Sequence, residues 1–177
     1  KLSQGKVSID EEKELRFYER GWGLLNELGY AQYEISNFAQ AGAECIHNTN
    51  TWRMHEWLGC GPSAASQYGG ERYQRPANLD HWCAALESGE YPKTERVELD
   101  DDLLLADSII FGLRMNAGVD LDVLQERFHA SAHRRELEAA LRRFESEGLV
   151  ESKGPHYRLT HQGRLLCDAI GSALLDI

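Results

Sequence analysis

The chain has 177 residues, of which 42% are hydrophobic and 27% charged, and its 19 basic and 29 acidic side chains give a formal net charge of −10. This apolar fraction excludes wholesale disorder. No run of about 18 apolar residues occurs, so no membrane-spanning helix is predicted. The acidic balance argues against a broad surface for nucleic acid phosphates, which needs clustered Lys and Arg.

The start of the chain, KLSQGKVSIDEEKE, is polar and begins without Met. It lacks the apolar middle of a secretory signal. We therefore expect a cytoplasmic protein, and a chain that is a piece of a longer one.

The four cysteines, Cys45, Cys60, Cys83 and Cys167, are far apart in the sequence. They show neither the C-x-x-C spacing of a zinc site nor the closely spaced thiolates that usually hold an iron–sulfur cluster. We expect reduced thiols, with Cys60, Cys83 and Cys167 buried and inert.

A pair of histidines, His129 and His133, would lie one helical turn apart if the helices around them merged. No acidic partner pattern of the H-E-x-x-H kind accompanies them. We interpret the pair as part of a solvated surface, and no metal site is predicted in this chain.

The first predicted element is a helix over residues 9–28, with Ser8 and Glu11 at capping-box spacing. Its apolar residues recur at steps of three and four and form one stripe: Leu15, Tyr18, Trp22, Leu25 and Leu28. Gly29 stands where a left-handed C-cap is expected. A short strand over residues 30–35 follows, and this order is typical of an α/β layer.

Residues 36–57 show no periodicity, which predicts a loop of about twenty residues, a length that usually carries function. Residues 57–66 then read as a short buried strand that runs into small side chains. Asn78 can cap a helix over residues 79–88. The charged stretch 90–98 is interpreted as a domain boundary.

The C-terminal part alternates helices with one hairpin. Three acidic residues open the first helix, where the helix dipole favours negative charge. The predicted elements are helices over residues 100–115, 120–128 and 132–147, strands over 149–151 and 156–159, and a final helix after Thr160. Helix, helix, hairpin, helix is the order of a winged-helix-like module.

Three strings resemble the radical SAM family of oxygen-independent coproporphyrinogen III oxidase-like proteins, and within it the heme chaperone branch, HemW. They are Tyr33-Glu34-Ile35-Ser36-Asn37-Phe38-Ala39, Cys45-Ile-His47-Asn48-x-x-x-Trp52 and Leu58-Gly59-x-Gly61-Pro-x-Ala64. Weaker matches follow in the same order as in the family: Gly112-Leu113-Arg114, Gly118-Val119-Asp120, Gly148-Leu149-Val150 and Gly163-Arg164-Leu165-Leu166.

The resemblance implies a mixed α/β and α+β fold. Residues 1–94 would be the C-terminal remnant of a radical SAM partial (β/α) barrel, and residues 95–177 a small, winged-helix-like, mostly helical domain. The family's C-x-x-x-C-x-x-C motif, which binds the [4Fe-4S] cluster that cleaves S-adenosylmethionine, is absent from this sequence. Both cofactors would therefore act in the intact parent, and we expect this chain alone to have no catalytic residues and no activity.

The same resemblance points to a haem contact at Cys45, His47, Asn48 and Trp52, because imidazole and thiolate are common axial ligands of haem iron. The heme chaperone branch carries a His-Asn-x-x-Tyr-Trp motif, and Thr51 replaces its tyrosine. The alternative is that His47 and Asn48 hydrogen-bond to the loop backbone and order it.

The glycine-rich string has two interpretations as well. In the family, this strand end borders the S-adenosylmethionine pocket, which implies pocket roles for Gly59, Gly61 and Ala64, with Ala64 facing the adenosine. Many relatives have histidine where this chain has Ala65. The alternative is a tight strand end, because small residues allow close approach of the backbone.

Glu34 lies within the most specific of the three strings. A buried carboxylate needs a partner, and we expect an ion pair with Arg53, Arg72 or Arg75. We also interpret Arg75-x-x-Asn78 as a backbone anchor followed by a helix cap.

Two hypotheses for function follow. The first is a fragment of a HemW-like protein of haem delivery or porphyrin metabolism, with haem or a porphyrinogen as partner, the other half of the barrel missing, and a tendency to dimerise through exposed apolar surface. The second is a non-catalytic interaction module whose winged-helix-like domain binds protein or nucleic acid. The arginines that would meet phosphates, Arg134, Arg135, Arg142 and Arg143, are interleaved with glutamates, which favours a salt-bridged solvated face.

Overall fold

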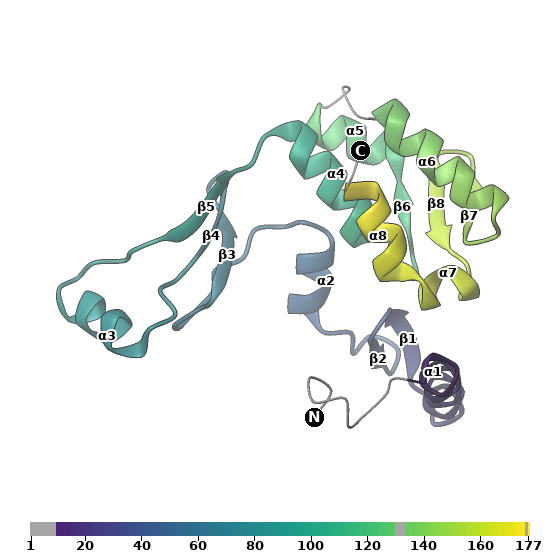
Figure 1. The fold of residues 1–177 in the computed structure, drawn as a ribbon, viewed down its shortest axis with the longest axis horizontal. Helices are drawn as coiled ribbons and strands as arrows, with labels where there is room; N and C mark the ends of the chain where they lie inside the picture. Colours follow the sequence, from purple (N-terminus) through teal and green to yellow (C-terminus); the bar gives the residue numbers. More distant parts are fainter. Residues whose placement is uncertain (1–9, 130–133, 176) are drawn as a thin grey trace.

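The computed structural model describes residues 10–129, 134–175 and 177. Figure 1 shows a helical C-terminal half, a long arm that projects away from it, and an N-terminal group of elements beneath it. The N-terminal group holds α1 (Glu11–Glu27), β1 (Ala31–Glu34), β2 (Asn37–Ala39) and α2 (Ile46–Trp52). The arm holds β3 (Ala65–Tyr68), β4 (Glu71–Gln74), α3 (Leu79–Glu87) and β5 (Thr94–Glu98).

The C-terminal half begins with α4 (Asp101–Gly112), whose side chains supply much of its core. The elements after it are β6 (Val119–Asp120), α5 (Leu121–Phe128), α6 (Arg134–Ser146), β7 (Val150–Lys153), β8 (His156–Leu159), α7 (His161–Leu165) and α8 (Cys167–Leu175). The strands form an antiparallel sheet in the order β6-β8-β7.

The helix α1 begins later than the sequence predicted. Its N-cap is Asp10, whose side chain accepts a hydrogen bond from the Lys13 backbone at 3.0 Å, so the prediction of a cap at Ser8 was wrong. Ser8 itself lies outside the described residues. Gly29 follows the helix with a φ of +83°, as predicted. Much of the apolar stripe of α1 is exposed, with Tyr18 at 52%.

The predicted twenty-residue loop is wrong, because it contains β2 and α2. The strand β2 pairs antiparallel with β1 through the tight turn that separates them. The helix α2 has seven residues and buries none of them fully. Its sequence therefore lacks the apolar periodicity by which a helix is recognised.

The arm is a three-stranded antiparallel sheet in the order β3-β4-β5, with α3 at its far end (Figure 1). The predicted buried strand over 57–66 is wrong: Trp57 makes only an isolated bridge to Gln67, and β3 starts at Ala65. Part of the stretch assigned to a boundary forms β5, which pairs with β4.

The capping predictions in the arm are confirmed. The Asn78 side chain accepts a hydrogen bond from the His81 backbone at 2.9 Å. Arg75 follows β4 and donates to the carbonyl oxygens of Tyr91 and Pro92 at 3.0 and 3.3 Å. It thereby ties the end of β4 to the segment that precedes β5. The Asn78 cap follows from residue type and spacing, whereas Arg75 reaches residues 16 and 17 positions further along the chain.

A charged contact ties the arm to the C-terminal half. Arg72 on β4 donates to the carboxylate of Asp107 on α4 at 2.7 Å, and to Gln67 on the neighbouring strand at 2.7 Å. Asp107 and Gln67 are both buried. Because burying a carboxylate without a partner is costly, this contact fixes where the arm leaves the body.

The C-terminal half follows the sequence closely. Asp100, Asp120 and Thr160 each cap the following helix with a side-chain oxygen, and Leu137, Leu141 and Phe144 are buried on one face of α6. The final helix differs from the prediction, because it breaks at Leu166 into α7 and α8. Gly163 approaches Leu149 so closely that a Cβ atom would lie 1.8 Å from its carbonyl oxygen.

The helix α5 ends before the second histidine of the pair is reached. His129 is the C-cap of α5 in the left-handed conformation, with φ of 51°, so α5 ends there. His133 lies outside the described residues. Within the described ranges, no helix has the length and apolar character needed to cross a membrane.

The core of the C-terminal half gives a direct stability test. Leu141 is 0% exposed and packs among residues of α4, α5, α6 and α8. Leu141→Ala is expected to lower the free energy of unfolding by about 2–5 kcal/mol, because it removes buried methyl groups and leaves a cavity. The control Val123→Ala, at a side chain 61% exposed, is expected to change it by no more than about 0.5 kcal/mol. Urea unfolding measures both, and equal effects would contradict the assigned core.

Candidate functional site

The end of β1 holds a carboxylate that no solvent reaches. Glu34 is 0% exposed, and its Oε1 accepts hydrogen bonds from the Ser36 backbone at 2.8 Å and from the Asn37 side chain. Its Oε2 faces the guanidinium of Arg114 at 3.8 Å. The predicted partners Arg53, Arg72 and Arg75 were therefore wrong, and the partner comes from the segment after α4.

That segment also pairs with β1 through its backbone. The Ile35 N–H donates to the Arg114 carbonyl at 3.1 Å, and the Asn116 N–H donates to the Tyr33 carbonyl at 3.1 Å. The Asn116 side chain adds a hydrogen bond to the Gln32 carbonyl at 2.6 Å. Residues 114–116 therefore pair with the free edge of β1 and join the β1–β2 hairpin to the C-terminal half.

The same arginine holds the end of α2. The Arg114 guanidinium lies over the Trp52 ring at 4.7 Å, and the other neighbour of Trp52 is the Phe111 ring, stacked at 6.0 Å. Arg114 also donates to Asp168 at 3.0 Å. A cation over an indole face is attracted by the ring quadrupole, so Trp52 links α2 to α4.

The candidate haem residues lie on different faces of α2. Successive helical residues are rotated by about 100°, so Asn48 shares the face of Trp52, whereas His47 points about 140° away from it. Burial agrees with this geometry: Asn48 and Trp52 are half-buried and His47 is exposed. Cys45, the N-cap residue, is exposed too, and its backbone N–H donates to the Tyr33 hydroxyl at 3.3 Å.

Thr51, which stands in place of the family's tyrosine, is engaged within the helix. Its hydroxyl donates to the His47 carbonyl at 3.0 Å. This bond uses the His47 backbone and leaves the imidazole outside the helix's own hydrogen bonds. The structure therefore brings together a packed indole and a solvent-facing imidazole on one short helix.

The glycine-rich string forms an irregular turn before β3. The Gly59 N–H donates to the Ser66 hydroxyl at 3.0 Å, and a Cβ at Gly59 would meet the Ala65 carbonyl oxygen at 2.2 Å. Ala64 is half-buried, and its carbonyl accepts from the Arg75 backbone at 3.0 Å. Gly61 has a φ of +104° and open space where a side chain would be.

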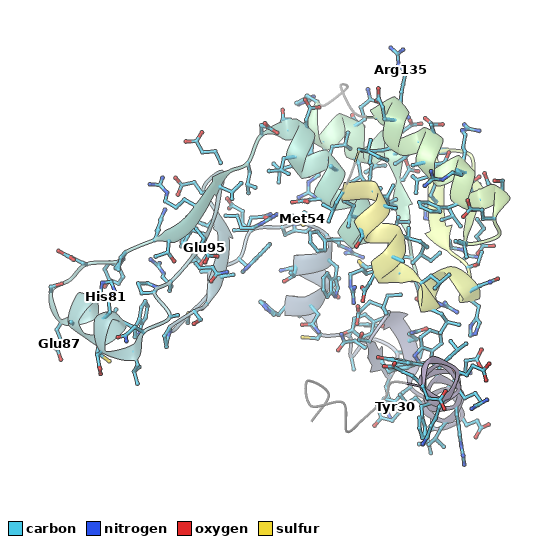
Figure 2. The ribbon with its side chains drawn as sticks, in the orientation of Figure 1. Tyr30, Met54, His81, Glu87, Glu95 and Arg135 are labelled. Atoms are coloured by element: carbon cyan, nitrogen blue, oxygen red, sulfur yellow. The ribbon has the colours of Figure 1, made fainter. Side chains whose placement is uncertain are left out.

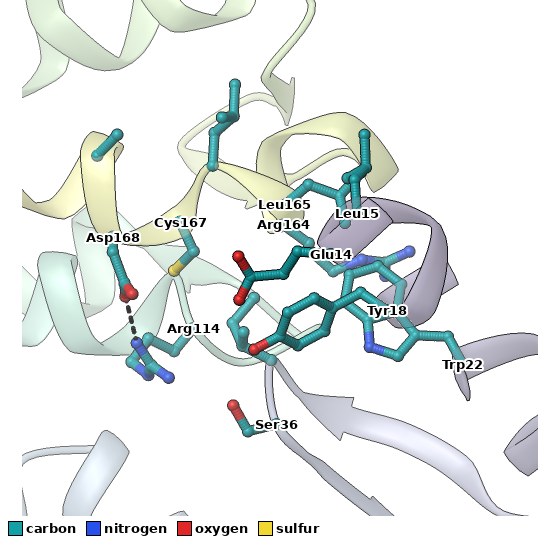
Figure 3. A pocket seen from close by; sticks show the side chains of 13 residues that line it. Glu14, Leu15, Tyr18, Trp22, Ser36, Arg114, Arg164, Leu165, Cys167 and Asp168 are labelled. Carbon is teal, nitrogen blue, oxygen red and sulfur yellow. Dashed lines mark hydrogen bonds and ion pairs between the residues drawn. The ribbon is translucent and has the colours of Figure 1, made fainter. Parts of the chain in front are cut away.

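A pocket of about 500 Å³ lies between α1 and the α7–α8 junction, and Figure 3 shows its lining. Tyr18, Trp22 and Leu165 supply apolar walls, and Arg114 lines one side, paired with Asp168. None of the candidate haem or S-adenosylmethionine residues lines this pocket. Trp52 instead lines a smaller cavity of about 180 Å³ beside α5.

The cysteines depart from the prediction. Cys45, Cys60 and Cys83 are exposed and only Cys167 is buried, so the expectation of burial was wrong for Cys60 and Cys83. Burial raises the pKa of the Cys167 thiol to about 11. In the described part of the chain, no three His, Cys, Asp or Glu side chains form a metal-binding group.

Sequence reasoning missed Phe111, Arg114 and Arg127 as residues of this site. Arg127 donates to the carbonyl oxygens of Arg53 and Met54, at 2.8 and 2.9 Å. Burial of the Arg127 guanidinium lowers its pKa. One signal was available, because Arg114 belongs to the Gly112-Leu113-Arg114 string that resembles the family.

Comparison with known proteins identifies the C-terminal half first. The family called HemN C-terminal domain matches residues 99–166. A solved structure, described as coproporphyrinogen III oxidase (HemN) from Escherichia coli, a radical SAM enzyme, superposes with a TM-score of 0.74 over 98% of this chain and 44% of that one. At 18% identity, this likeness shows a shared fold.

Curated relatives extend the match to nearly the whole chain. The heme chaperone HemW of Bacillus subtilis is 30% identical over 175 residues, which are 98% of this chain and 46% of that protein. The mitochondrial radical S-adenosyl methionine domain-containing protein 1 of Danio rerio is 30% identical over 184 residues, 99% of this chain and 40% of its own length. The chain thus spans less than half the length of these relatives.

The fold and the sequence agree on the class: residues 99–166 are a HemN C-terminal domain. Along nearly its whole length, the chain is similar to HemN- and HemW-like radical SAM proteins. The family resemblance inferred from the sequence strings is confirmed.

The buried carboxylate gives a test of how the two halves are joined. Glu34→Gln keeps the side chain's size but removes the charge that faces Arg114 and that strengthens the hydrogen bonds from Ser36 and Asn37, and a hydrogen bond to a charged group contributes about 1.5–3 kcal/mol. We expect the free energy of unfolding in urea to fall by about that amount. Asp168→Asn removes the other partner of Arg114, whose side chain is 94% exposed, and is expected to cost no more than about 1 kcal/mol. A larger loss of stability in Asp168→Asn than in Glu34→Gln would show that Glu34 does not hold β1 to the C-terminal half.

Thiol labelling tests the cysteine environments. A thiol reacts as its thiolate, and the raised pKa and burial of Cys167 suppress that form at pH 8. We expect Ellman's reagent to modify three thiols readily, and the fourth only after denaturant is added. The Cys167→Ser variant should still show all three fast thiols. Fast labelling of four thiols in the folded protein would contradict this assignment.

Proposed function

We propose that the chain contributes the α2 site and the C-terminal domain to a HemW-like radical SAM protein of haem delivery or porphyrin metabolism. The observation that carries the proposal is the arrangement on α2, where Trp52 is packed against the C-terminal half and His47 faces solvent. The family relation supports it, because the relatives include heme chaperones.

In a chaperone, haem is the cargo, and the residues on the outer face of α2 suit its iron. Imidazole nitrogen and thiolate sulfur are both axial ligands of haem iron. His47 and Cys45 are exposed at the same end of the helix. Thr51 supplies no aromatic face, so the haem plane would rest on groups other than the family's tyrosine.

S-adenosylmethionine and the [4Fe-4S] cluster belong to the same proposal, but only for the whole protein. The glycine-rich turn suits a ligand that approaches the backbone, since Gly61 leaves open space, and Gly59, Gly61 and Ala64 remain the candidates. The four cysteines do not fit a cluster, because the C-x-x-x-C-x-x-C motif is absent from the sequence. When bound, the cluster supplies an electron that cleaves S-adenosylmethionine.

We also propose the division into a barrel part, residues 1–94, and a winged-helix-like domain, residues 95–177. The order helix, strand, helix, helix, hairpin in the C-terminal half supports the winged-helix-like assignment of residues 95–177. Arg142 pairs with Glu138 at 2.6 Å, and Arg134 pairs with Asp122. These ion pairs support a solvated face in preference to a phosphate-binding one.

We also propose that the protein is cytoplasmic.

The apolar face of α1 enters the proposal as a contact surface. Tyr18 is 52% exposed and Leu15 41% exposed on this face. Exposed apolar patches of this kind mark interaction sites. We propose that further barrel residues cover this face in the whole protein, and that two copies of the chain associate through it when those residues are absent.

A hemin titration followed by absorbance tests the haem site. Wild type is expected to give a saturable Soret shift, and His47→Ala to weaken binding by about tenfold or more, because the variant removes the proposed iron ligand. His81→Ala is the matched control, since His81 is an exposed histidine on α3, in the distant arm (Figure 2).

Three outcomes are informative. Loss in His47→Ala alone supports the α2 site. Equal loss in both variants would indicate non-specific coordination by surface histidines, and no loss in either would remove His47 from the site. Cys45→Ser, tested alongside, reports whether the neighbouring thiol shares the iron.

A further inference from the structure

The helix α2 is too short to hold its own position. It has seven residues, buries none fully, and its N-cap residue makes no side-chain capping bond. Isolated helices shorter than about 12–15 residues are marginal in water. The direction of its axis, and with it the direction of the His47 side chain, must therefore be set by the groups that contact it.

Arg127 contacts the C-terminal end of this helix. Its two Nη atoms donate to the carbonyl oxygens of Arg53, the C-cap residue, and of Met54, at 2.8 and 2.9 Å. Carbonyls at a helix C-terminus carry partial negative charge, and hydrogen bonds from a charged donor are about twice as strong as neutral ones. The guanidinium is itself held against the Phe128 ring at 4.5 Å.

The backbone under this contact is in an unusual conformation. Met54, labelled in Figure 2, is buried between α2 and the arm. Its φ is 54°, in the left-handed region that residues other than glycine rarely adopt. Such a conformation persists only where surrounding contacts determine it. Arg127 bonds to the Met54 carbonyl, and so supplies one of those contacts.

The second attachment is the Trp52 stack, which fixes the inner face of the helix. Arg114 and Phe111 hold the indole, and both come from the C-terminal half. The outer face, with His47, is exposed. Both attachments lie at the C-terminal end of this two-turn helix, and together they set where its other end points.

We propose that Arg127 is a positioning residue of the α2 site: by fixing the carbonyls at the end of α2, it presents His47 to the haem in a single orientation. This inference rests on the proposed haem function. It assigns the C-terminal domain an indirect part in binding, because Arg127 acts through the end of α2.

The first test needs no ligand. Hydrogen–deuterium exchange is measured on the peptide spanning residues 46–54 in wild type, Arg127→Met, Arg127→Lys and Arg135→Met. Arg135 is an exposed arginine on α6 (Figure 2) and serves as the matched control. Met keeps the apolar stem over Phe128, and Lys keeps the charge but offers no paired donors.

We expect exchange in 46–54 to rise about tenfold in Arg127→Met, to rise less in Arg127→Lys, and to stay unchanged in Arg135→Met. Exchange in the α6 peptide should not change in any variant. Unchanged exchange at 46–54 would show that the Arg127 contacts do not order α2, and would overturn the proposal. If Arg127→Met does not fold, as judged by circular dichroism, Arg127→Lys decides the same question.

The second test is a double-mutant cycle with hemin. Arg127→Met is expected to weaken hemin binding about tenfold and to shift or broaden the Soret band, since coupling through a positioning contact is worth up to about that factor. In the His47→Ala background, the same substitution should have no further effect. An equal loss in both backgrounds would overturn the proposal, because Arg127 would then act independently of His47.

The two tests separate the two ideas. If His47→Ala leaves hemin binding unchanged while Arg127→Met loosens residues 46–54, the haem function fails, and with it the positioning role. Arg127 would still be shown to order α2. If His47→Ala abolishes binding and Arg127→Met changes neither exchange nor affinity, the haem function stands and the positioning role is overturned.

Discussion

The fold depends on how one buried carboxylate is neutralised. Glu34 has no access to solvent, and an ionised carboxylate in such a place is costly without hydrogen bonds and a counter-charge. Its own turn supplies two donors, and Arg114 supplies the charge. Since Arg114 comes from the segment after α4, the end of β1 can be buried only when the C-terminal half is in place.

Arg114 does more than neutralise a charge. A guanidinium is planar, so its edges can pair with carboxylates while its face stacks on an aromatic ring. Arg114 uses both features, toward Glu34, Asp168 and Trp52. A lysine could not make this set of contacts. The string YEISNFA, the helix α2 and the end of α4 are therefore parts of one physical unit, although the sequence separates them widely.

Much of the C-terminal half could be predicted because its signals are local. Caps at Asp100, Asp120 and Thr160 are decided by residue type and spacing, and the apolar face of α6 is decided by periodicity. The segment 36–66 could not be predicted in the same way. α2 has no buried stripe, and β2 is three residues long, so neither leaves a pattern strong enough to read.

The candidate site shows the same limit. The motif residues of α2 were recognised by resemblance, but their environment depends on contacts with residues 111–127, far along the chain. For Glu34, burial could be expected and a cationic partner could be expected, yet the choice among arginines required the fold. The sequence analysis predicted Arg53, Arg72 or Arg75, whereas the backbone pairing of β1 with residues 114–116 selected Arg114.

The geometry of α2 suggests why its motif combines a histidine and a tryptophan five positions apart. With about 100° of rotation per residue, that spacing places the two side chains on nearly opposite faces, so one can be packed while the other faces outward. The indole packs against Phe111 of α4, and this packing holds α2 on the C-terminal half. An exposed histidine cannot make such a contact. The ligand-binding role proposed for His47 needs such an anchor, because so short a helix contributes little stability of its own. The tryptophan in this motif is therefore explained by the packing of α2 on the C-terminal domain, independently of any contact it makes with haem.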